Sequence, residues 1–201
     1  MDCNSDSMYL GDNKMIFKEK EIKGVFEIQQ EPHRDARGFF SRTYDDNLFK
    51  EYGIDRKWVQ ENHSLSQKKG TLRGIHFQYT PDTETKLLRV ITGEIFFAVI
   101  DLRKNSETLG KWISVIVSSE KLNMLYIPRG CAPGMCTLTD NCNLAYKVDN
   151  YYASNNEDVI KWNDPDLNIK WPITEPEVIS ERDSKGNSFQ DFVKKNGGLD
   201  I

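Results

Sequence analysis

The most constraining feature of this chain is a long succession of short runs rich in β-branched and aromatic residues. A first strand-like pattern covers Ile16–Gln29, and from about residue 54 onward such runs follow one another with little interruption. Gly, Pro, Asn and Asp separate them, with turn-forming clusters at Tyr79–Asp82, Lys104–Ser106 and Thr139–Asn141. Short strands at this spacing are typical of β-sandwiches and barrels. We therefore predict an all-β sandwich or barrel with a few short helices.

Two segments have helical rather than strand character. Asn47–Tyr52 is followed by Gly53, a residue that often ends a helix, and Phe189–Lys194 can form one or two helical turns. The first residues are polar and patternless, so we expect a flexible leader over residues 1–14 and a single domain over residues 15–201. A chain of 201 residues is of suitable length for one all-β domain.

Composition excludes several classes of protein. A net charge of −4 argues against a fold that binds nucleic acid over its whole surface, so any phosphate site must be a local basic patch. No apolar run is long enough to span a membrane, and the N-terminus lacks a secretory signal, so we expect a cytoplasmic protein. The four cysteines, Cys3, Cys131, Cys136 and Cys142, form no zinc-type pairs with histidines. We expect reduced thiols, the last three of them small core residues.

One of only three histidines in the chain lies in the segment Thr71–Gln78, two residues after a glycine. Because side chains alternate along a strand, Arg73 is predicted to share a face with Ile75, and His76 to lie near the opposite face if no bulge intervenes. An arginine close to an imidazole on a rigid strand suits an anion site with a general base, since imidazole titrates near neutral pH. The alternative is that His76 is a buried histidine with a purely structural role.

Polar residues at every second position mark the segment just before it. Gln60, Asn62, Ser64 and Ser66 would place four hydrogen-bonding side chains on one face of a strand. Such a face can contact solvent or line a polar cavity. Its position directly before the His76 segment favours the cavity.

Further motifs follow in a fixed order along the chain. They are Lys86–Val90, Gly93–Asp101, Leu125–Gly130, Tyr146–Tyr152, Trp162–Pro165 and Ser180–Asp183. With the two segments described above, this series resembles the dTDP-4-dehydrorhamnose 3,5-epimerases, metal-free cupins of nucleotide-sugar biosynthesis. The resemblance extends from about Lys23 to about Ser188. It implies a cupin jelly roll, a homodimer, and an isomerase with a nucleotide-sugar substrate and no cofactor.

The implied reaction inverts C3, C5 or both in a 4-keto-6-deoxy or 3,6-dideoxy hexose. It needs a base on one face of the sugar ring, a proton donor on the other and a group that stabilises the enolate oxygen. By their positions in the family's motifs, His76 with Asp183 is the expected base, Tyr146 the acid and Lys86 the cation near the keto oxygen. Without the resemblance, Asp183 reads as a surface turn residue, Tyr146 as an ordinary strand aromatic and Lys86 as a solvated charge.

The resemblance also implies residues that bind the substrate. Arg73 is expected to pair with the diphosphate, because a guanidinium matches phosphate oxygens. Tyr152 offers a stacking surface for the base or sugar. Gln60 and Asn62 are expected to line the same site.

Another implied contact comes from the segment Arg37–Arg42, which in the family reaches into the site of a neighbouring subunit. Arg37 and Phe40 are thereby expected to contact substrate in a homodimer, for which two-fold symmetry is the default. The family pattern Arg-Gly-x-Phe-x-Glu ends in a glutamate that accepts the N3–H of thymine, whereas this chain has Arg42. Arginine cannot accept a hydrogen bond, but it can donate to the N3 of cytosine. A CDP-sugar is therefore predicted as an alternative to a dTDP-sugar, unless Arg42 simply faces solvent.

A second departure lies in Gly130–Met135, where the family usually has Gly-Phe-Ala-His-Gly-Phe. Pro133 replaces the histidine, which in the family lies close to the sugar. Proline has no polar side-chain atom and no N–H, so one polar contact is lost. This loss is consistent with inversion at one carbon only, or with a different sugar.

Two other functions stay open, and metal chemistry is not predicted. A cupin ketoisomerase that moves the carbonyl between C4 and C3 also needs a base, although Tyr146 favours epimerisation because inversion requires a donor across the ring. A catalytically inactive sugar-nucleotide-binding module is suggested by Pro133 alone. Other cupins hold a metal through a His-x-His pair with a downstream Glu and His, a pattern that His33, His63 and His76 do not supply. An active enzyme would serve polysaccharide biosynthesis, for example of lipopolysaccharide O-antigen.

Overall fold

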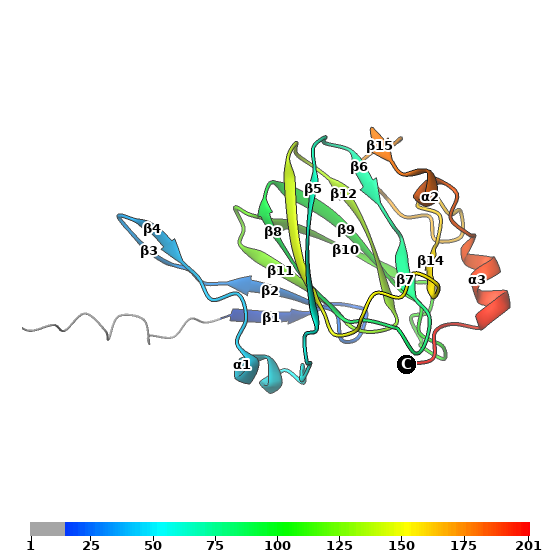
Figure 1. Cartoon of the computed structure of the whole chain (residues 1–201), viewed down its shortest axis with the longest axis horizontal. Coiled ribbons are helices and arrows are strands. Elements are labelled where there is room, and N and C mark those ends of the chain that lie inside the picture. Colours follow the sequence, from blue (N-terminus) through cyan, green and yellow to red (C-terminus); the bar gives the residue numbers. More distant parts are fainter. Residues whose placement is uncertain (1–14) are drawn as a thin grey trace, which may run out of the picture.

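Two β-sheets packed face to face make up most of the protein (Figure 1), of which this computed structural model describes residues 15–201. In spatial order, the larger sheet contains β1 (Met15–Glu19), β2 (Phe26–Gln30), β11 (Asn123–Ile127), β8 (Lys86–Thr92), β13 (Cys142–Val148) and β5 (Gln60–Ser66). The smaller contains β10 (Trp112–Ser118), β9 (Glu94–Asp101), β12 (Cys131–Thr137), β6 (Thr71–Arg73) and β15 (Val178–Ile179). The prediction of an all-β sandwich is confirmed.

The remaining elements lie at the margins of the sandwich. They are the paired strands β7 (His76–Gln78) and β14 (Glu157–Val159), the hairpin β3 (His33–Asp35) and β4 (Gly38–Phe40), and the helices α1 (Asp46–Glu51), α2 (Glu181–Ser184) and α3 (Phe189–Asn196). The first and third helices match the predicted helical segments. No pattern indicated α2, which has only four residues.

Inward-facing side chains of both sheets form one continuous core. Leu88 of β8 and Leu125 of β11 pack with Phe97 of β9 and Val115 of β10, and all four are buried. Full burial of one such side chain stabilises the fold by about 1.5–3 kcal/mol. The sandwich is therefore a rigid frame on which the two sheets can present side chains to each other.

Strand β9 is buried on both of its faces. Phe97 points to the other sheet, whereas Phe96 and Ile100 pack under α3 and the segment near Leu167, together with Phe192. This double coverage explains why the strand is an unbroken apolar run instead of an alternating one.

Three of the cysteines are core residues, as predicted. Cys131, Cys136 and Cys142 are free and buried. Burial raises the pKa of the Cys131 thiol to about 12 and that of Cys136 to about 11, so both thiols stay protonated at neutral pH. The predicted polar leader, including Cys3, lies outside the described residues.

The three helices are short or polar. Over residues 15–201, none has the length and apolarity that crossing a bilayer requires.

Candidate active site

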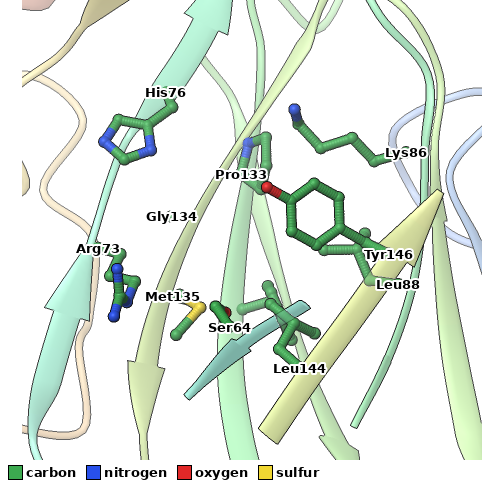
Figure 2. Close-up of a pocket in the computed structure, with 11 residues that line it drawn as sticks. Ser64, Arg73, His76, Lys86, Leu88, Pro133, Gly134, Met135, Leu144 and Tyr146 are labelled. Carbon is green, nitrogen blue, oxygen red and sulfur yellow. The ribbon is translucent and has the colours of Figure 1, made fainter. Parts of the chain in front are cut away.

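A cavity of about 210 Å³ lies between the two sheets (Figure 2). The smaller sheet and β7 contribute Arg73, His76, Phe97, Pro133, Gly134 and Met135, and the larger sheet contributes Ser64, Lys86, Leu88, Leu144 and Tyr146. Polar and charged groups thus enter from both sides, over a partly apolar floor. A cavity with a few convergent polar groups is the usual form of a small-molecule site.

On the side of the smaller sheet, His76 is hydrogen-bonded to a buried carboxylate. Its Nε2 lies 2.7 Å from Oδ1 of Asp183, and the other oxygen, Oδ2, accepts the backbone N–H of Gly74 at 3.0 Å. Asp183 belongs to α2, where its own N–H donates to the N-cap Ser180 at 3.0 Å. The carboxylate is 3% exposed, so it is not the surface turn residue of the alternative reading.

This environment favours the ionised form of Asp183. Burial acts to raise the pKa of the carboxyl, but the hydrogen bond and charge of His76, with the N–H of Gly74, outweigh burial and hold the pKa below its usual range. The carboxylate can therefore fix the orientation of the imidazole and stabilise its protonated form. With Nε2–H donating to Asp183, Nδ1 is the nitrogen left to accept a proton.

Arg73 and His76 both line the cavity, because the uninterrupted strand that the expected alternation requires is not present here. The strand is interrupted between them, because β6 ends at Arg73 and β7 begins at His76. Gly74 has φ +106°, a conformation that L side chains rarely adopt, and the chain changes partner from β12 to β14 at this point. The alternation restarts after the turn.

The opposite side of the cavity carries Lys86 of β8 and Tyr146 of β13. The ammonium of Lys86 lies 5.9 Å from the centre of the Tyr146 ring, and Figure 2 shows both polar ends directed across the cavity towards the side that holds His76. Burial raises the pKa of Tyr146, and nearby carboxylates raise it further. The phenol is therefore held as a protonated group.

Strand β5 shows the predicted alternation. Gln60, Asn62 and Ser64 are partly buried, whereas His63 is exposed and contacts Asn143 at 3.1 Å on the outer face. Of the predicted residues, Ser64 reaches the cavity, and Asn62 is paired in register with Tyr146.

Gln60 connects this strand to the predicted stacking residue. Its Oε1 accepts the backbone N–H of Tyr152 at 2.9 Å. The Tyr152 ring is 59% exposed, and its hydroxyl donates to Glu157 at 2.8 Å. Neither Gln60 nor Tyr152 is part of the cavity lining, but an exposed ring is available for stacking.

The three residues predicted on the early segment do not reach the cavity of their own chain. Arg37 pairs with Asp35 at 2.6 Å in the β3–β4 hairpin, which projects from the sandwich in Figure 1. Phe40 is 45% exposed on the same hairpin, and Arg42 pairs with Asp45 at 3.2 Å. Contact of these side chains with substrate in another subunit stays a prediction.

Several lining residues were missed from the sequence. Leu88 and Leu144 lie two positions from Lys86 and Tyr146 on the same strands, so the period of two could have identified them. Phe97 and Met135 belong to strands without clear alternation and gave no such signal.

Pro133 lies in the cavity wall on β12. In Figure 2 its ring lies between His76 and Tyr146, and the Tyr146 hydroxyl points towards it. The loss of a polar group inferred from the sequence is thus located in the wall of the cavity that the two residues expected to move protons also line.

Within residues 15–201, His, Cys, Asp and Glu side chains form no group of three or more that could hold a metal ion.

Comparison with known proteins gives one consistent result. The sequence model of the family described as dTDP-4-dehydrorhamnose 3,5-epimerase matches residues 19–191. A dTDP-4-dehydrorhamnose 3,5-epimerase of Shigella flexneri is 40% identical over 173 residues, which span 85% of this chain and 94% of that protein.

Two solved structures have closely similar folds. One is a 3,5-epimerase of Legionella pneumophila in complex with dTDP-4-keto-L-rhamnose, with a TM-score of 0.83, 36% identity, and coverage of 87% of this chain and 93% of that one. The other is a 3′-monoepimerase of Streptomyces bikiniensis in complex with dTDP-quinovose, with a TM-score of 0.81, 28% identity and coverage of 90% of each chain. The agreement confirms the cupin jelly roll.

Proposed function

Because this chain belongs to the dTDP-4-dehydrorhamnose 3,5-epimerase family and is a nucleotide-sugar epimerase, we propose that it inverts C3 and C5 of a dTDP-linked 4-keto-6-deoxyhexose. One observation carries the assignment to this cavity. His76 with its carboxylate partner and Tyr146 come from opposite sides of the cavity and face the same space (Figure 2). Inversion at carbon requires a base and an acid on opposite faces of the sugar ring, and this arrangement provides them.

The proposed step consists of proton transfers and needs no cofactor. Nδ1 of His76 takes the proton from the carbon next to the ketone, and the C–H electron pair moves to give an enolate with its charge on the keto oxygen. The Lys86 ammonium stabilises that charge. The Tyr146 hydroxyl then delivers a proton to the opposite face of the carbon, and the enolate returns to a ketone. Exchange with solvent restores the protons of both side chains.

We propose dTDP as the nucleotide. The ligands of two similar structures, dTDP-4-keto-L-rhamnose and dTDP-quinovose, support it. The prediction of a CDP-sugar from Arg42 is still to be tested, and in this chain the guanidinium is paired with Asp45. Calorimetric titration with dTDP, CDP, UDP and GDP tests both: preference for dTDP supports the proposal, whereas tight binding of CDP alone overturns it.

The proposal includes a homodimer in which Arg37 and Phe40 of one subunit complete the site of the other. The projecting hairpin and the absence of both side chains from the described lining of their own cavity support it. Mixing Arg37→Ala and His76→Asn proteins, with subunit exchange, is expected to restore part of the activity. No recovery in a verified hybrid would show that Arg37 acts within its own subunit or not at all. We also place the enzyme in the cytoplasm, which cell fractionation can test.

Incubation with a dTDP-4-keto-6-deoxyglucose substrate in D₂O tests the reaction directly. Deuterium at C3 and C5 with both centres inverted is the expected result. A 3-keto product would instead identify a ketoisomerase, and saturable binding without exchange would identify an inactive binding module.

Pro133 supports inversion at a single carbon as the second candidate, because it lines the same cavity as Tyr146 and offers no polar side-chain group there. Deuterium and inversion at one position only would establish this candidate. In that case the Pro133→His protein is expected to gain exchange at the other carbon, and an unchanged pattern would exclude Pro133 as the cause.

A further inference from the structure

A second carboxylate, largely shielded from solvent, lies beside the cavity, and the proposed reaction does not use it. Glu84 lies two residues before the first residue of β8, Lys86, and forms an ion pair with it. The side chain of Glu84 is 13% exposed and that of Lys86 is 12% exposed. An ion pair this well shielded is screened by solvent less than a pair on the open surface.

The backbone that carries this pair is attached to the strand that carries Tyr146. Thr85, between the two charged residues, donates its N–H to Oδ1 of Asp149 at 2.6 Å, and Asp149 follows directly on β13. The Asp149 side chain is 3% exposed, and its Oδ2 accepts a hydrogen bond from the Nε–H of Arg129 at 3.1 Å. Glu84, Lys86 and Tyr146 therefore belong to one rigid unit.

Charges on several elements act on Tyr146. Glu84 before β8 and Glu157 on β14 raise the pKa of its hydroxyl, in addition to the larger effect of burial, and Arg73 on β6 lowers it. The ammonium of Lys86 lies over its ring, and His76 lies across the cavity. Glu84 thus contacts one predicted catalytic group and influences the other through its charge.

We propose that Glu84 is a positioning residue for the epimerisation, whose carboxylate holds the Lys86 ammonium against the face of the Tyr146 ring and balances its charge until the enolate oxygen forms. This inference depends on the roles proposed for Lys86 and Tyr146. In the free enzyme the ammonium has a partner within the protein, and in the reaction the enolate oxygen becomes a second one. Removing the carboxylate therefore frees the ammonium to leave its place and removes a negative charge near the phenol.

Two substitutions separate these effects. In Glu84→Gln an amide oxygen can still accept a hydrogen bond from Lys86, so kcat is expected to stay within about threefold of the wild type. In Glu84→Ala the contact is lost, and misplacement of a catalytic group is expected to lower kcat about 10- to 100-fold with little change in KM. Both variants lack the charge, so the alkaline limb of the pH–rate profile is expected to move to lower pH as Tyr146 ionises more readily.

The outer face of the same sheet offers a matched control. Glu61 pairs with Lys147, the residue next to Tyr146, at 3.0 Å, but its side chain is 51% exposed. Glu61→Gln removes a carboxylate from a Lys–Glu pair close to Tyr146 in the chain without touching the cavity. Its kcat, KM and pH profile are expected to match those of the wild type.

Tyrosinate absorbance gives a readout that needs no turnover. The difference between titrations of each protein with and without Tyr146→Phe isolates one of the eight tyrosines. A downward shift of that titration in Glu84→Gln, with no shift in Glu61→Gln, supports the inference. An unchanged titration, or a folded Glu84→Ala protein with wild-type kcat, overturns it. If the wild type were inactive but the Tyr146 titration still moved to lower pH in Glu84→Gln, the result would count against the proposed function. It would not count against the charge effect of Glu84.

Discussion

The two sides of the cavity are built in different ways. His76 is held by hydrogen bonds that join distant parts of the chain, since Asp183 bonds both to it and to the backbone of Gly74, 109 residues away. Tyr146 is placed by the register of adjacent strands, and within residues 15–201 its hydroxyl has no hydrogen-bond partner. The proposed base is thus oriented by specific hydrogen bonds, and the proposed acid by packing and charge. Substitutions on the two sides of the cavity should therefore impair the enzyme in different ways.

The largest effect is expected from His76→Asn. Loss of the base should lower kcat/KM roughly 10²- to 10⁴-fold, and deuterium exchange at the sugar carbons should fall with it. Steady-state kinetics and NMR of the sugar in D₂O measure both quantities. Exchange at the wild-type rate in this variant would remove His76 from the mechanism.

Tyr146→Phe should separate deuterium exchange at the sugar carbons from inversion of those carbons. Without the donor, inversion is expected to fall about 10²-fold, while His76 still removes the proton and returns deuterium to the same face. NMR should therefore detect labelled but uninverted sugar. The control is Tyr126→Phe, because Tyr126 is buried in a separate cluster under α1 and should leave both rates unchanged. Equal loss of exchange and inversion would contradict distinct roles for the two sides.

Gly74→Ala tests the turn on the His76 side. An added Cβ would lie 2.9 Å from the carbonyl oxygen of Pro133, and the backbone has φ +106°. We expect the free energy of unfolding to fall by about 2–3 kcal/mol. Gly53→Ala is the matched control, since Gly53 also has positive φ (+75°) but has nothing within 4 Å of an added Cβ. It should cost about 1–2 kcal/mol, from conformation alone. Equal losses in denaturant unfolding would show that the contact with Pro133 is unimportant.

The smallest effect concerns acid stability. The pKa of Asp183 is lower in the folded protein than its ordinary value of 3.8, so the unfolded chain binds more protons in that range. The stabilisation is fully present above the unfolded value and is lost as pH falls through the folded one. The wild type should therefore exceed Asp183→Asn in unfolding free energy at pH 7, and the gap should narrow below about pH 4. A gap independent of pH would mean that the charge contributes nothing to stability.

Much of the Tyr146 side could be predicted from the sequence. The inward face of β5 followed directly from polar residues at every second position, and β8 and β13 follow the same rule. On the His76 side of the cavity the alternation of side chains does not continue past Arg73, although an uninterrupted strand would have separated Arg73 from His76. The cause is local, because a glycine with positive φ interrupts the strand and restarts the alternation.

Other features of the site had no periodic pattern in the sequence, and the pairing of Asp183 with His76 was expected from the family motifs alone. Helix α2 is too short to show periodicity, yet it buries Asp183 against His76. Glu84 lies outside any strand, and only the fold shows that its carboxylate meets Lys86 beside the cavity.

The sequence by itself determined the sandwich, the direction of side chains within each uninterrupted strand, and the ordered motifs that indicate the family. These depend on backbone geometry over a few residues, which the local order of residue types records. Only the tertiary structure decided how the break at Gly74 brings Arg73 and His76 into one cavity, how α2 buries Asp183 against the imidazole, and where Pro133 lies in the cavity wall. Such contacts join segments far apart in the chain, and packing of the two sheets selects them over the alternatives that local geometry allows.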